Sequence, residues 1–432
     1  MARGTETQGS PWTERLCDRF LRYVKVHTTS AEDSSTTPST ERQLDLGRML
    51  ADELRAMGLT ARLDEHGYVY ATLPENLPAG HPARGKVPAV GFIAHMDTSP
   101  DAPGLEVKPQ VIRGYRGGDI ALPGDPDQLI RAAETPELAS QIGHDLITSD
   151  GTTLLGADDK AGIAEIMDAV ERMLADPTIL HGTVQIAFTP DEEIGRGADK
   201  FDVAGFGARI AYTLDGDVLG KIEDETFNAH AATFTLKGYN VHPGSAKDKM
   251  INTLYAAAEI IRRLPADMRP ETTAGRQGYL HPHHIDGTVD ACTLRLLVRD
   301  HDIGKSHEKI LLLERIAAEV RTLLPGVGIE LKVKESYLNM KPKLDEDPRI
   351  IRIAMDACRA AGLTPFLDVI RGGTDGARLC YMGILTPNIF TGGSNYHSVR
   401  EWASLHDMEK AVQVVIKIAG LWVDEAARSS RT

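Results

Sequence analysis

Two adjacent glutamates, Glu192 and Glu193, follow a run of apolar residues that ends near position 188. Neighbouring side chains diverge, so one carboxylate of such a pair can bind a metal ion while the other faces a water molecule as general base. Two adjacent acids are more often a solvated turn. The pair therefore indicates chemistry only if other metal-binding side chains lie at the same place in the fold.

Further potential ligands occupy that kind of place, after predicted buried strands or at the start of a helix. They are His95, Asp97, Asp158, Asp159, Asp215 and His397. Taken singly, each has an ordinary explanation, such as a packed histidine or an aspartate that caps a helix. In an open α/β sheet, however, ligands bind outside the carboxyl ends of the strands. We therefore expect these side chains, scattered in sequence, to meet at one edge.

Two histidines and several carboxylates suit zinc, with cobalt or manganese as possible substitutes. One carboxylate that bridges two metal ions would let them share a water molecule and polarise a carbonyl group. His95 and Asp97 are one residue apart and share a face of an ideal strand, so Asp97 could orient the imidazole. These features predict a metal-dependent hydrolase.

The composition is that of an ordinary globular protein with room for more than one domain: 432 residues, 42% hydrophobic and 25% charged. Acidic residues outnumber basic ones by 62 to 48, and the net charge of -14 argues against nucleic acid or an anionic membrane as partner. Residues 1–13 lack the apolar core of a signal peptide, and no apolar stretch is long enough to cross a bilayer. The four cysteines form no CxxC pair, which is typical of reduced thiols, so we expect a cytoplasmic protein.

The first part of the chain alternates helical patterns with short apolar strands, which favours an α/β fold with a largely parallel sheet. The expected elements are helices at 14–27, 41–57 and 158–174 and strands at 68–73, 87–94, 183–188 and 209–214.

The middle of the chain alternates as half-exposed antiparallel strands do, and the end returns to the first style. The expected elements are strands at 229–239, 289–298, 329–334 and 385–390 and helices at 252–264, 307–324, 349–361 and 408–427. The simplest architecture is one α/β domain built from both chain ends, with an α+β domain inserted in the middle.

Seven motifs are similar to those of the M20 metallopeptidases, and within them to the tripeptide aminopeptidases. They are HMD at 95–97, GADDKAG at 156–162, PDEEIG at 190–195, DG at 215–216, NVHPGSAK at 240–247, RGGTDG at 371–376 and NYH at 395–397. The resemblance covers almost the whole chain. It implies a catalytic domain at 1–226 and 339–432 and an inserted lid and dimerisation domain at 227–338.

The resemblance also implies a dinuclear zinc centre, in which Asp158 bridges the two ions. The implied ligands of the first zinc ion are His95, Asp158 and Asp215, and those of the second are Asp158, Glu193 and His397. Glu192 would be the general base and Asp97 the partner of His95, and the bond between Asp158 and Asp159 would be cis.

Four residues are implied to act on the substrate, and three of them have a competing explanation. His242 would polarise the scissile carbonyl, but it could also be a turn histidine before Pro243. Arg299 and Arg371 would contact the terminal carboxylate, which arginine binds well, although Arg299 could form a surface salt bridge. Asn252, at the start of a helix, could equally be only an N-cap.

Two segments depart from the family pattern. After His397 the family often has Gly-Lys-His-Glu, whereas this chain has SVRE at 398–401, so the resemblance leaves the substrate preference open. The HPHH segment at 281–284 lies in the inserted domain, and we expect an exposed strand or turn there rather than a metal site. The first ten or so residues resemble a disordered extension.

The expected function is that of a homodimeric zinc aminopeptidase that releases the N-terminal residue of tripeptides. A dipeptidase, a carboxypeptidase or an N-acyl-amino-acid deacylase would keep the chemistry and change the substrate. A non-catalytic binding protein on the same fold would be expected to have lost ligands or the base. Because the six implied ligand and base residues are all present, the enzyme is the favoured hypothesis.

Overall fold

The structure is a computed structural model that describes residues 10–429, so the predicted N-terminal extension lies almost entirely outside the described residues. The chain forms two compact units. Of the described residues, unit 1 contains 10–224, 343–368 and 374–429, and unit 2 contains 225–342 and 369–373. The segment 369–373 was expected in the catalytic domain. It belongs to unit 2 because the N–H of Ile370 donates to the carbonyl of Glu225 and the N–H of Phe227 donates to that of Gly372.

Unit 1 is built on an eight-stranded sheet with the order β1-β2-β8-β3-β9-β16-β10-β15. The strands are β1 (Thr60–Leu63), β2 (Val69–Leu73), β3 (Val90–His95), β8 (Val184–Thr189), β9 (Ile210–Gly216), β10 (Lys221–Glu225), β15 (Phe366–Val369) and β16 (Asn388–Phe390). The four adjacent strands β8, β3, β9 and β16 run parallel, whereas β1, β2 and β10 pair antiparallel with their neighbours. The predicted largely parallel sheet is confirmed.

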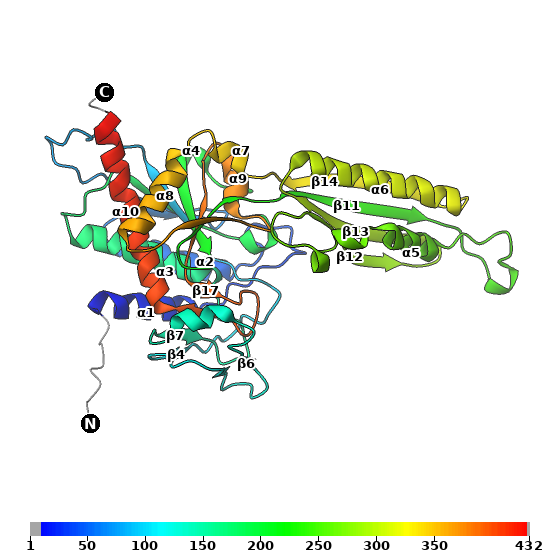
Figure 1. Ribbon diagram of the computed structural model, residues 1–432, viewed down its shortest axis with the longest axis horizontal. Coiled ribbons are helices and arrows are strands. Elements are labelled where there is room, and N and C mark those ends of the chain that lie inside the picture. The colour runs from blue at the N-terminus through cyan, green and yellow to red at the C-terminus, as the bar shows by residue number, and fades with distance from the viewer. Residues whose placement is uncertain (1–9, 430–432) are drawn as a thin grey trace. The chain divides into compact units, whose positions relative to one another are not determined.

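Helices pack on both faces of this sheet. The neighbouring residues Phe92 and Ile93 of β3 point to opposite faces of the sheet, and each belongs to a different hydrophobic core. The larger core takes in α1 (Pro11–Tyr23), α2 (Gln43–Ala56), α3 (Ala157–Ala175), α8 (Arg349–Ala360) and α10 (Leu405–Ser429), and α10 packs on α3 and α8 (Figure 1). The smaller core takes in α4 (Val203–Phe206) and α9 (Asp375–Tyr381).

Helix α3 shows why the sequence folds in this way. Ile163, Ile166, Met167 and Val170 are buried at the spacing of one helix face. A Cβ atom at Gly162 would collide with the carbonyl oxygen of Leu214, so glycine lets α3 approach β9 closely. The helix is therefore held against the strand that carries Asp215.

Unit 1 also contains short strands that the sequence did not reveal, four of them between β3 and α3 and two after β16. A four-stranded sheet has the order β17-β18-β7-β4, with β4 (Gln110–Ile112), β7 (Leu146–Thr148), β17 (Gly393–Ser394) and β18 (Trp402–Ser404), and β5 (Ile120–Ala121) pairs with β6 (Leu129–Ile130). Strands of two or three residues are too short to show a periodic pattern. They bring segments near position 147 beside segments near position 403.

Unit 2 is an antiparallel four-stranded sheet with two helices packed on it (Figure 1), as predicted for an α+β domain. Its elements are β11 (Asn228–Lys237), β12 (Tyr279–Gly287), β13 (Ala291–Asp300), β14 (Gly328–Tyr337), α5 (Thr253–Arg263) and α6 (Ile303–Leu323). Helix α6 begins before its predicted start because the Asp302 side chain caps it by accepting from the N–H of Lys305 at 2.9 Å. The segment 281–284 lies in β12, in agreement with the exposed strand or turn that was expected there.

The four cysteines, Cys17, Cys292, Cys358 and Cys380, are free and buried. Among residues 10–429, no helix is long and apolar enough to cross a membrane.

Candidate active site

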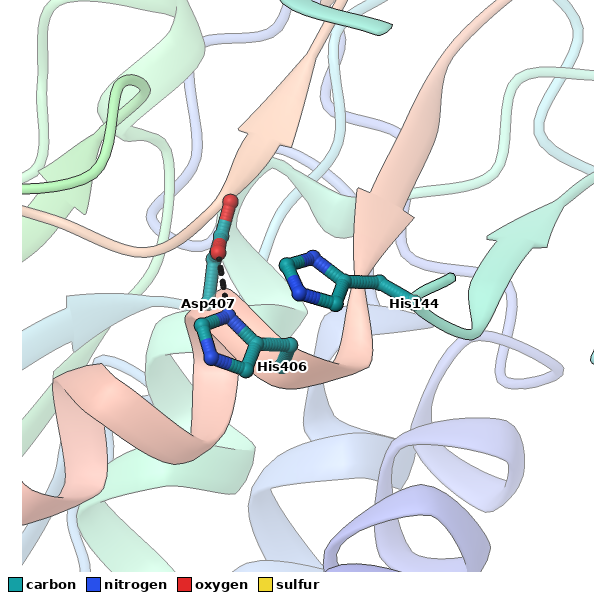
Figure 2. Close-up of side chains that lie close together, drawn as sticks. All are labelled: His144, His406 and Asp407. Carbon is teal, nitrogen blue, oxygen red and sulfur yellow. Dashed lines mark hydrogen bonds and ion pairs between the residues drawn. The ribbon is translucent and has the colours of Figure 1, made fainter. Parts of the chain in front are cut away.

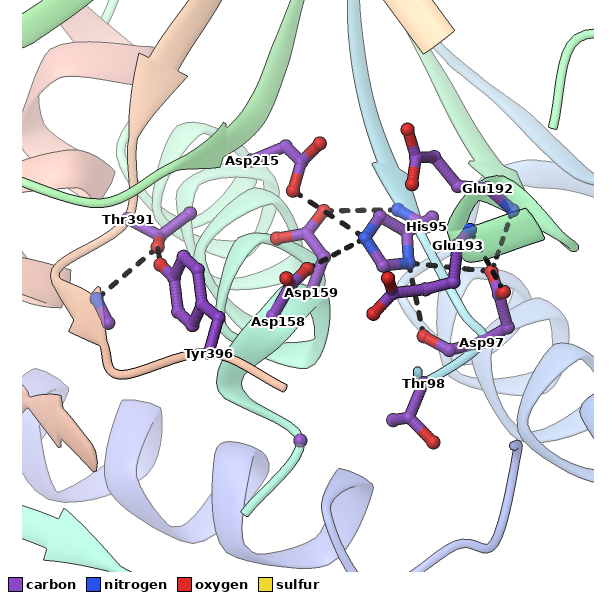
Figure 3. Close-up of polar contacts among 12 residues, drawn as sticks. His95, Asp97, Thr98, Asp158, Asp159, Glu192, Glu193, Asp215, Thr391 and Tyr396 are labelled. Atoms are coloured by element: carbon purple, nitrogen blue, oxygen red, sulfur yellow. Dashed lines mark hydrogen bonds and ion pairs between the residues drawn. The ribbon is translucent and has the colours of Figure 1, made fainter. Parts of the chain in front are cut away.

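The predicted ligands come together at the carboxyl ends of the parallel strands. Figure 3 shows all of them except His397. His95 is the last residue of β3, and Asp215 lies near the end of β9. Glu192 and Glu193 begin the short 3-10 helix η2 (Glu192–Ile194) just after β8. His397 follows β16 beyond a glycine turn, and Asp158 lies in the first turn of α3. Because β8, β3, β9 and β16 are parallel neighbours, their ends lie along one edge.

Asp158 lies between the two imidazoles. Its Oδ1 atom is 2.8 Å from His95 Nε2, and its Oδ2 atom is 3.4 Å from His397 Nε2. His95 Nε2 is also 3.5 Å from Asp215 Oδ1, and His397 Nε2 is 2.8 Å from Glu193 Oε2. The side chains therefore divide into two groups that share only Asp158.

These distances fit metal coordination. Ligand atoms that surround a zinc ion tetrahedrally with bonds of about 2.0 Å are about 3.3 Å apart. The four nitrogen–oxygen separations around Asp158 run from 2.8 to 3.5 Å. The Glu193 Oε1 atom is buried and has no hydrogen-bond partner among the described residues, which leaves it available as a ligand. The two groups thus fit two divalent ions, and two imidazoles with carboxylates suit zinc, cobalt or manganese.

The buried carboxylates of the site also favour the binding of cations. Burial raises the pKa of Glu193 to about 8 and that of Asp215 to about 7, and the nearby charge of Asp158 adds to both shifts. The hydrogen bonds to Asp158 and Glu193 raise the pKa of His397 to about 11. Several carboxylates crowded in a low-dielectric site resist ionisation together. Divalent ions would supply the missing positive charge.

Asp97 holds the glutamate pair in place. Its Oδ1 atom accepts a hydrogen bond from the N–H of Glu192 at 2.9 Å, and its Oδ2 atom accepts one from the N–H of Glu193 at 3.2 Å. The expected contact with His95 is also present, with Asp97 Oδ1 3.4 Å from His95 Nδ1 and the Asp97 carbonyl oxygen 3.0 Å from the same nitrogen. Asp97 therefore contacts both the imidazole and the turn that carries the glutamates.

The residue before the pair adopts a left-handed backbone. Asp191 has a φ of 60°, a conformation that residues other than glycine rarely adopt. Its carboxylate accepts hydrogen bonds from the N–H of Ser39 and from Gln43 Nε2, both at 2.7 Å. These contacts hold the backbone in that conformation and so aim the next two side chains. His397 also has a positive φ, of 59°. Unfavourable backbone geometry of this kind gathers at functional sites.

Glu192 lies beside the His95 side of the site. One carboxylate oxygen of Glu192 and one ligand atom each of His95 and Asp215 lie within 4.8 Å of one another. Burial raises the pKa of Glu192 well above its ordinary value, and the charge of Asp215 raises it further. A carboxyl group with a raised pKa can take up and release a proton near neutral pH, as a general base requires.

Glu401 is a further residue of the site, and the sequence marks it only as the last residue of the segment 398–401. It is 1% exposed, and its two carboxylate oxygens accept hydrogen bonds from the N–H groups of Leu155, Gly156 and Asp158 at 2.8, 2.7 and 2.9 Å. It thereby fixes the turn that presents the shared carboxylate. A glutamate four residues after His397 was the only signal in the sequence.

Two more positioning contacts could not be read from the sequence. Asp159 Oδ2 accepts from the N–H of His95 at 3.0 Å, and the peptide bond between Asp158 and Asp159 is cis, as the resemblance implied. Asn388 Oδ1 accepts from the N–H of Asp215 at 3.0 Å.

Asp375, at the start of α9, is buried and accepts from Thr189 Oγ1 at 2.6 Å. A Cβ atom at Gly197 would collide with this carboxylate, so glycine at 197 leaves room for it.

The predicted substrate residues of unit 2 make local contacts. His242 is exposed, and its Nδ1 atom accepts from the N–H of Gly244 at 3.1 Å. Asn252 is the N-cap of α5 and accepts from the N–H of Leu254 at 2.9 Å, so the capping explanation is confirmed for it.

The two arginines donate mainly to backbone carbonyl groups. Arg299 donates to the carbonyls of His230 and Val298 at 3.1 and 3.0 Å. Among the described residues, these hydrogen bonds rather than a salt bridge position its side chain. Arg371 donates to the carbonyls of Gly275 and Gln277, both at 2.7 Å, and through its second terminal nitrogen to a threonine hydroxyl at 2.9 Å.

Comparison with known proteins places the chain in a family. Residues 147–420 match Peptidase family M20/M25/M40. The chain is 48% identical over 404 residues to a Peptidase T of Exiguobacterium sp. (strain AT1b), which covers 93% of this chain and 97% of the relative. The chain belongs to peptidase family M20/M25/M40. The predicted resemblance is thus confirmed, and this M20 protein is a hydrolase that acts on peptide bonds.

Solved structures agree on the fold of this M20 peptidase. The aminopeptidase PepT of Bacillus cereus superposes with a TM-score of 0.73 at 23% identity and covers 95% of this chain and 99% of its own. The YXEP protein of Bacillus subtilis, described as a dinuclear metal binding peptidase from the M20 family, gives a TM-score of 0.65 at 15% identity, with coverage of 96% and 99%.

Proposed function

We propose that this M20 peptidase is a dinuclear zinc aminopeptidase that releases the N-terminal residue of tripeptides. The observation that carries the proposal is the position of Asp158, whose two oxygens face His95 and His397 separately. A carboxylate placed in this way can bridge two ions. The relatives named Peptidase T and aminopeptidase PepT support the substrate class.

In this proposal His95, Asp158 and Asp215 hold one zinc ion, and Asp158, Glu193 and His397 hold the other, with cobalt or manganese as possible substitutes. When bound, such ions polarise a carbonyl group and lower the pKa of water. Glu401 and Asn388 keep the turn before Asp158 and the backbone at Asp215 in position through their hydrogen bonds to backbone N–H groups.

Glu192 acts as the general base. Its carboxylate takes a proton from the attacking water and later passes that proton to the leaving amine. Asp97 accepts a hydrogen bond from the N–H of Glu192. This bond fixes the backbone from which the Glu192 carboxylate extends and so orients the base. The raised pKa that burial gives Glu192 matches this exchange of a proton.

Residues of unit 2 bind the substrate. His242, which is exposed and whose Nδ1 atom accepts from the N–H of Gly244, polarises the scissile carbonyl. Arg299 and Arg371 contact the terminal carboxylate of the substrate. To do so, each would give up a hydrogen bond to a backbone carbonyl group. Asn252 contributes to substrate binding by capping α5 with its side chain, which positions the start of that helix. Recognition of both chain ends would limit the length of the substrate.

The proposed assembly is a cytoplasmic homodimer formed through unit 2. Strands β12 and β14 are the edge strands of the unit 2 sheet, and they carry the exposed apolar side chains Ile285 and Val333. Sedimentation velocity of the wild type and of Ile285→Asp tests the dimer. A monomeric wild type contradicts it.

The activity is tested with a peptide panel and a metal determination on the same preparation. Di-, tri- and tetrapeptides with free N-termini are compared with N-acylated versions of each. We expect about two zinc ions per chain, turnover of tripeptides, and none of blocked peptides. Equal turnover of blocked and free peptides would contradict the aminopeptidase.

The same panel identifies the neighbouring activities. Preference for dipeptides indicates a dipeptidase, release of the C-terminal residue indicates a carboxypeptidase, and preferred cleavage of the acyl group indicates an N-acyl-amino-acid deacylase. Each of these outcomes would keep the metal centre and replace the proposed substrate.

A further inference from the structure

Asp101 lies beside the second imidazole of the Asp158 centre, and the proposed reaction gives it no role. Its Oδ2 atom is 3.1 Å from His397 Nδ1. The other ring nitrogen, His397 Nε2, is 2.8 Å from Glu193 Oε2 and 3.4 Å from Asp158 Oδ2. The His397 ring therefore lies between the candidate metal ligands on one side and the Asp101 carboxylate on the other.

This contact repeats the one that His95 makes. His95 Nδ1 is 3.0 Å from the carbonyl oxygen of Asp97 and 3.4 Å from its Oδ1 atom, while His95 Nε2 faces Asp158 at 2.8 Å (Figure 3). His397 has the same arrangement, with Asp101 in the place of Asp97. The two aspartates are four residues apart in one loop. This loop thus supplies the partner of the second ring nitrogen for both imidazoles.

The contact fixes which ring nitrogen of His397 carries a proton. A carboxylate only accepts, so His397 Nδ1 donates to Asp101 Oδ2. The neutral ring then has its lone pair on Nε2, the nitrogen that faces Asp158 and Glu193. Metal-bound histidine commonly donates its other ring N–H to a carboxylate in this way, which fixes the tautomer and the ring orientation and makes the ligand more basic.

The backbone on either side of Asp101 is anchored, although its side chain is 68% exposed. Before it, the N–H of Ser30 donates to the carbonyl of Thr98 at 3.2 Å. After it, the N–H of Leu154 donates to the carbonyl of Pro103 at 2.9 Å. These hydrogen bonds hold the loop at both ends, so the Asp101 carboxylate is presented to His397 from a fixed backbone.

His397 depends on such a partner more than His95 does. The His95 side chain ends a buried strand and is 2% exposed, whereas that of His397 lies on a loop after β17 and is 42% exposed. A partly exposed ring has fewer packing contacts that restrict its rotation, so ordering it for a ligand costs more conformational entropy. A hydrogen bond at Nδ1 supplies the restraint that packing does not.

An imidazole–carboxylate pair is not by itself a metal site, as another pair in unit 1 shows. His406 Nδ1 donates to Asp407 Oδ1 at 2.9 Å (Figure 2). The His406 ring, however, lies face to face with that of His144, with centroids 4.0 Å apart and planes that differ by 12°. The in-plane Nε2 lone pairs of two stacked rings cannot converge on one ion. At His397, by contrast, Nε2 faces two further carboxylates.

We propose that Asp101 is a positioning residue for the second metal ion, because it holds the His397 ring with Nε2 directed toward Asp158 and Glu193. The inference rests on the proposed function, in which His397 binds zinc. Asp101 contacts the ring nitrogen that does not bind the ion, so it acts through His397 and leaves the His95 side of the centre unchanged.

Zinc titration of the metal-free wild type and of Asp101→Ala, in competition with a chelating dye, tests the proposal. We expect both proteins to bind two ions, one of them about 10-fold more weakly in the variant, which is the lower end of the usual loss because Asp101 is exposed. The matched control Asp424→Ala, at an exposed position of α10, should bind zinc as the wild type does. Two ions of unchanged affinity in Asp101→Ala overturn the inference alone. Fewer than two ions in the wild type contradict the dinuclear centre and the inference together.

A second pair of proteins shows whether the effect passes through His397. Without the imidazole Asp101 has nothing to orient, so adding Asp101→Ala to His397→Ala should leave the affinity for the remaining ion unchanged. A further loss of affinity in the double variant would show that Asp101 acts on another part of the centre and overturns the assignment.

Asp101→Asn and a stability measurement separate positioning from a structural role. The amide oxygen of the Asn variant can still accept from His397 Nδ1, so its zinc affinity should lie between those of Asp101→Ala and the wild type. An affinity no higher than that of Asp101→Ala contradicts a role through this hydrogen bond. The urea midpoint of metal-free Asp101→Ala should equal that of the metal-free wild type, because the side chain is exposed. A lowered midpoint would assign Asp101 to the stability of the loop and overturn the proposal.

Discussion

The Asp97 carboxylate accepts a hydrogen bond from the backbone N–H of Glu192 at 2.9 Å, and its other oxygen accepts from the N–H of Glu193 at 3.2 Å. One fully buried side chain thus orients both the proposed general base and a proposed metal ligand. Because the same carboxylate lies 3.4 Å from His95 Nδ1, it also connects the glutamate turn to β3. Its position makes the two functions of the glutamate pair interdependent.

Glu192→Gln should remove the general base and leave the metal ligands intact. We expect both zinc ions to remain bound and turnover to fall by about 10²–10⁴, the usual contribution of a positioned base. Zinc content and kcat on a tripeptide are measured on the same sample. The matched control is Glu134→Gln, since that side chain is 62% exposed and should leave kcat unchanged. Full activity in Glu192→Gln would refute the assigned base.

Asp97→Asn should weaken metal binding as well as catalysis. The amide can present only one acceptor oxygen, so one of the N–H groups of Glu192 and Glu193 loses its partner. Loss of a partner in the layer around a metal site commonly lowers metal affinity about 10- to 100-fold. Zinc affinity is measured by competition with a chelating dye, and kcat is measured at saturating zinc. If zinc affinity were unchanged, Asp97 would act on the base alone.

The gathering of ligands at one sheet edge could be predicted because it depends on local signals. Continuous apolar runs predicted β3, β8 and β9, and the polar residues follow directly after them. The partners of these residues could not be predicted in the same way. Glu401 and Asn388 act through contacts with backbone N–H groups far away in sequence, and no residue pattern marks such a bond. The pairing of His144 with His406 depends on strands of three residues, which show no periodicity.

The segment that contains Arg371 lies in a different unit from the one expected, for a related reason. The segment 369–373 belongs to unit 2 through backbone hydrogen bonds to Glu225 and Phe227, and neither bond depends on side-chain type. Arg371 itself donates to carbonyl groups in the loop near position 276, which is also part of unit 2. Hydrophobic patterns separate the two units well only where strands and helices are long.

Glu401→Gln should destabilise the turn that presents Asp158. Three backbone N–H groups share the two carboxylate oxygens, and glutamine replaces one oxygen with a donor. At least one buried N–H loses its acceptor, which costs about 1–3 kcal/mol in the free energy of unfolding. Urea denaturation of the wild type and the variant measures this cost. Glu308→Gln, at an exposed position of α6, is the control and should have an unchanged midpoint.

Removal of metal should lower the stability of unit 1, because the Asp158 centre would then keep its buried carboxylates without divalent cations. Zinc at about a hundred times its dissociation constant stabilises a folded protein by about 2.7 kcal/mol for each site. We therefore expect the denaturation midpoint to fall on chelation and to recover when zinc is restored. Asp158→Asn should lose most of this dependence, since both proposed ions share that residue. An equal response to zinc with and without the Asp158 substitution would mean that Asp158 does not bridge the ions.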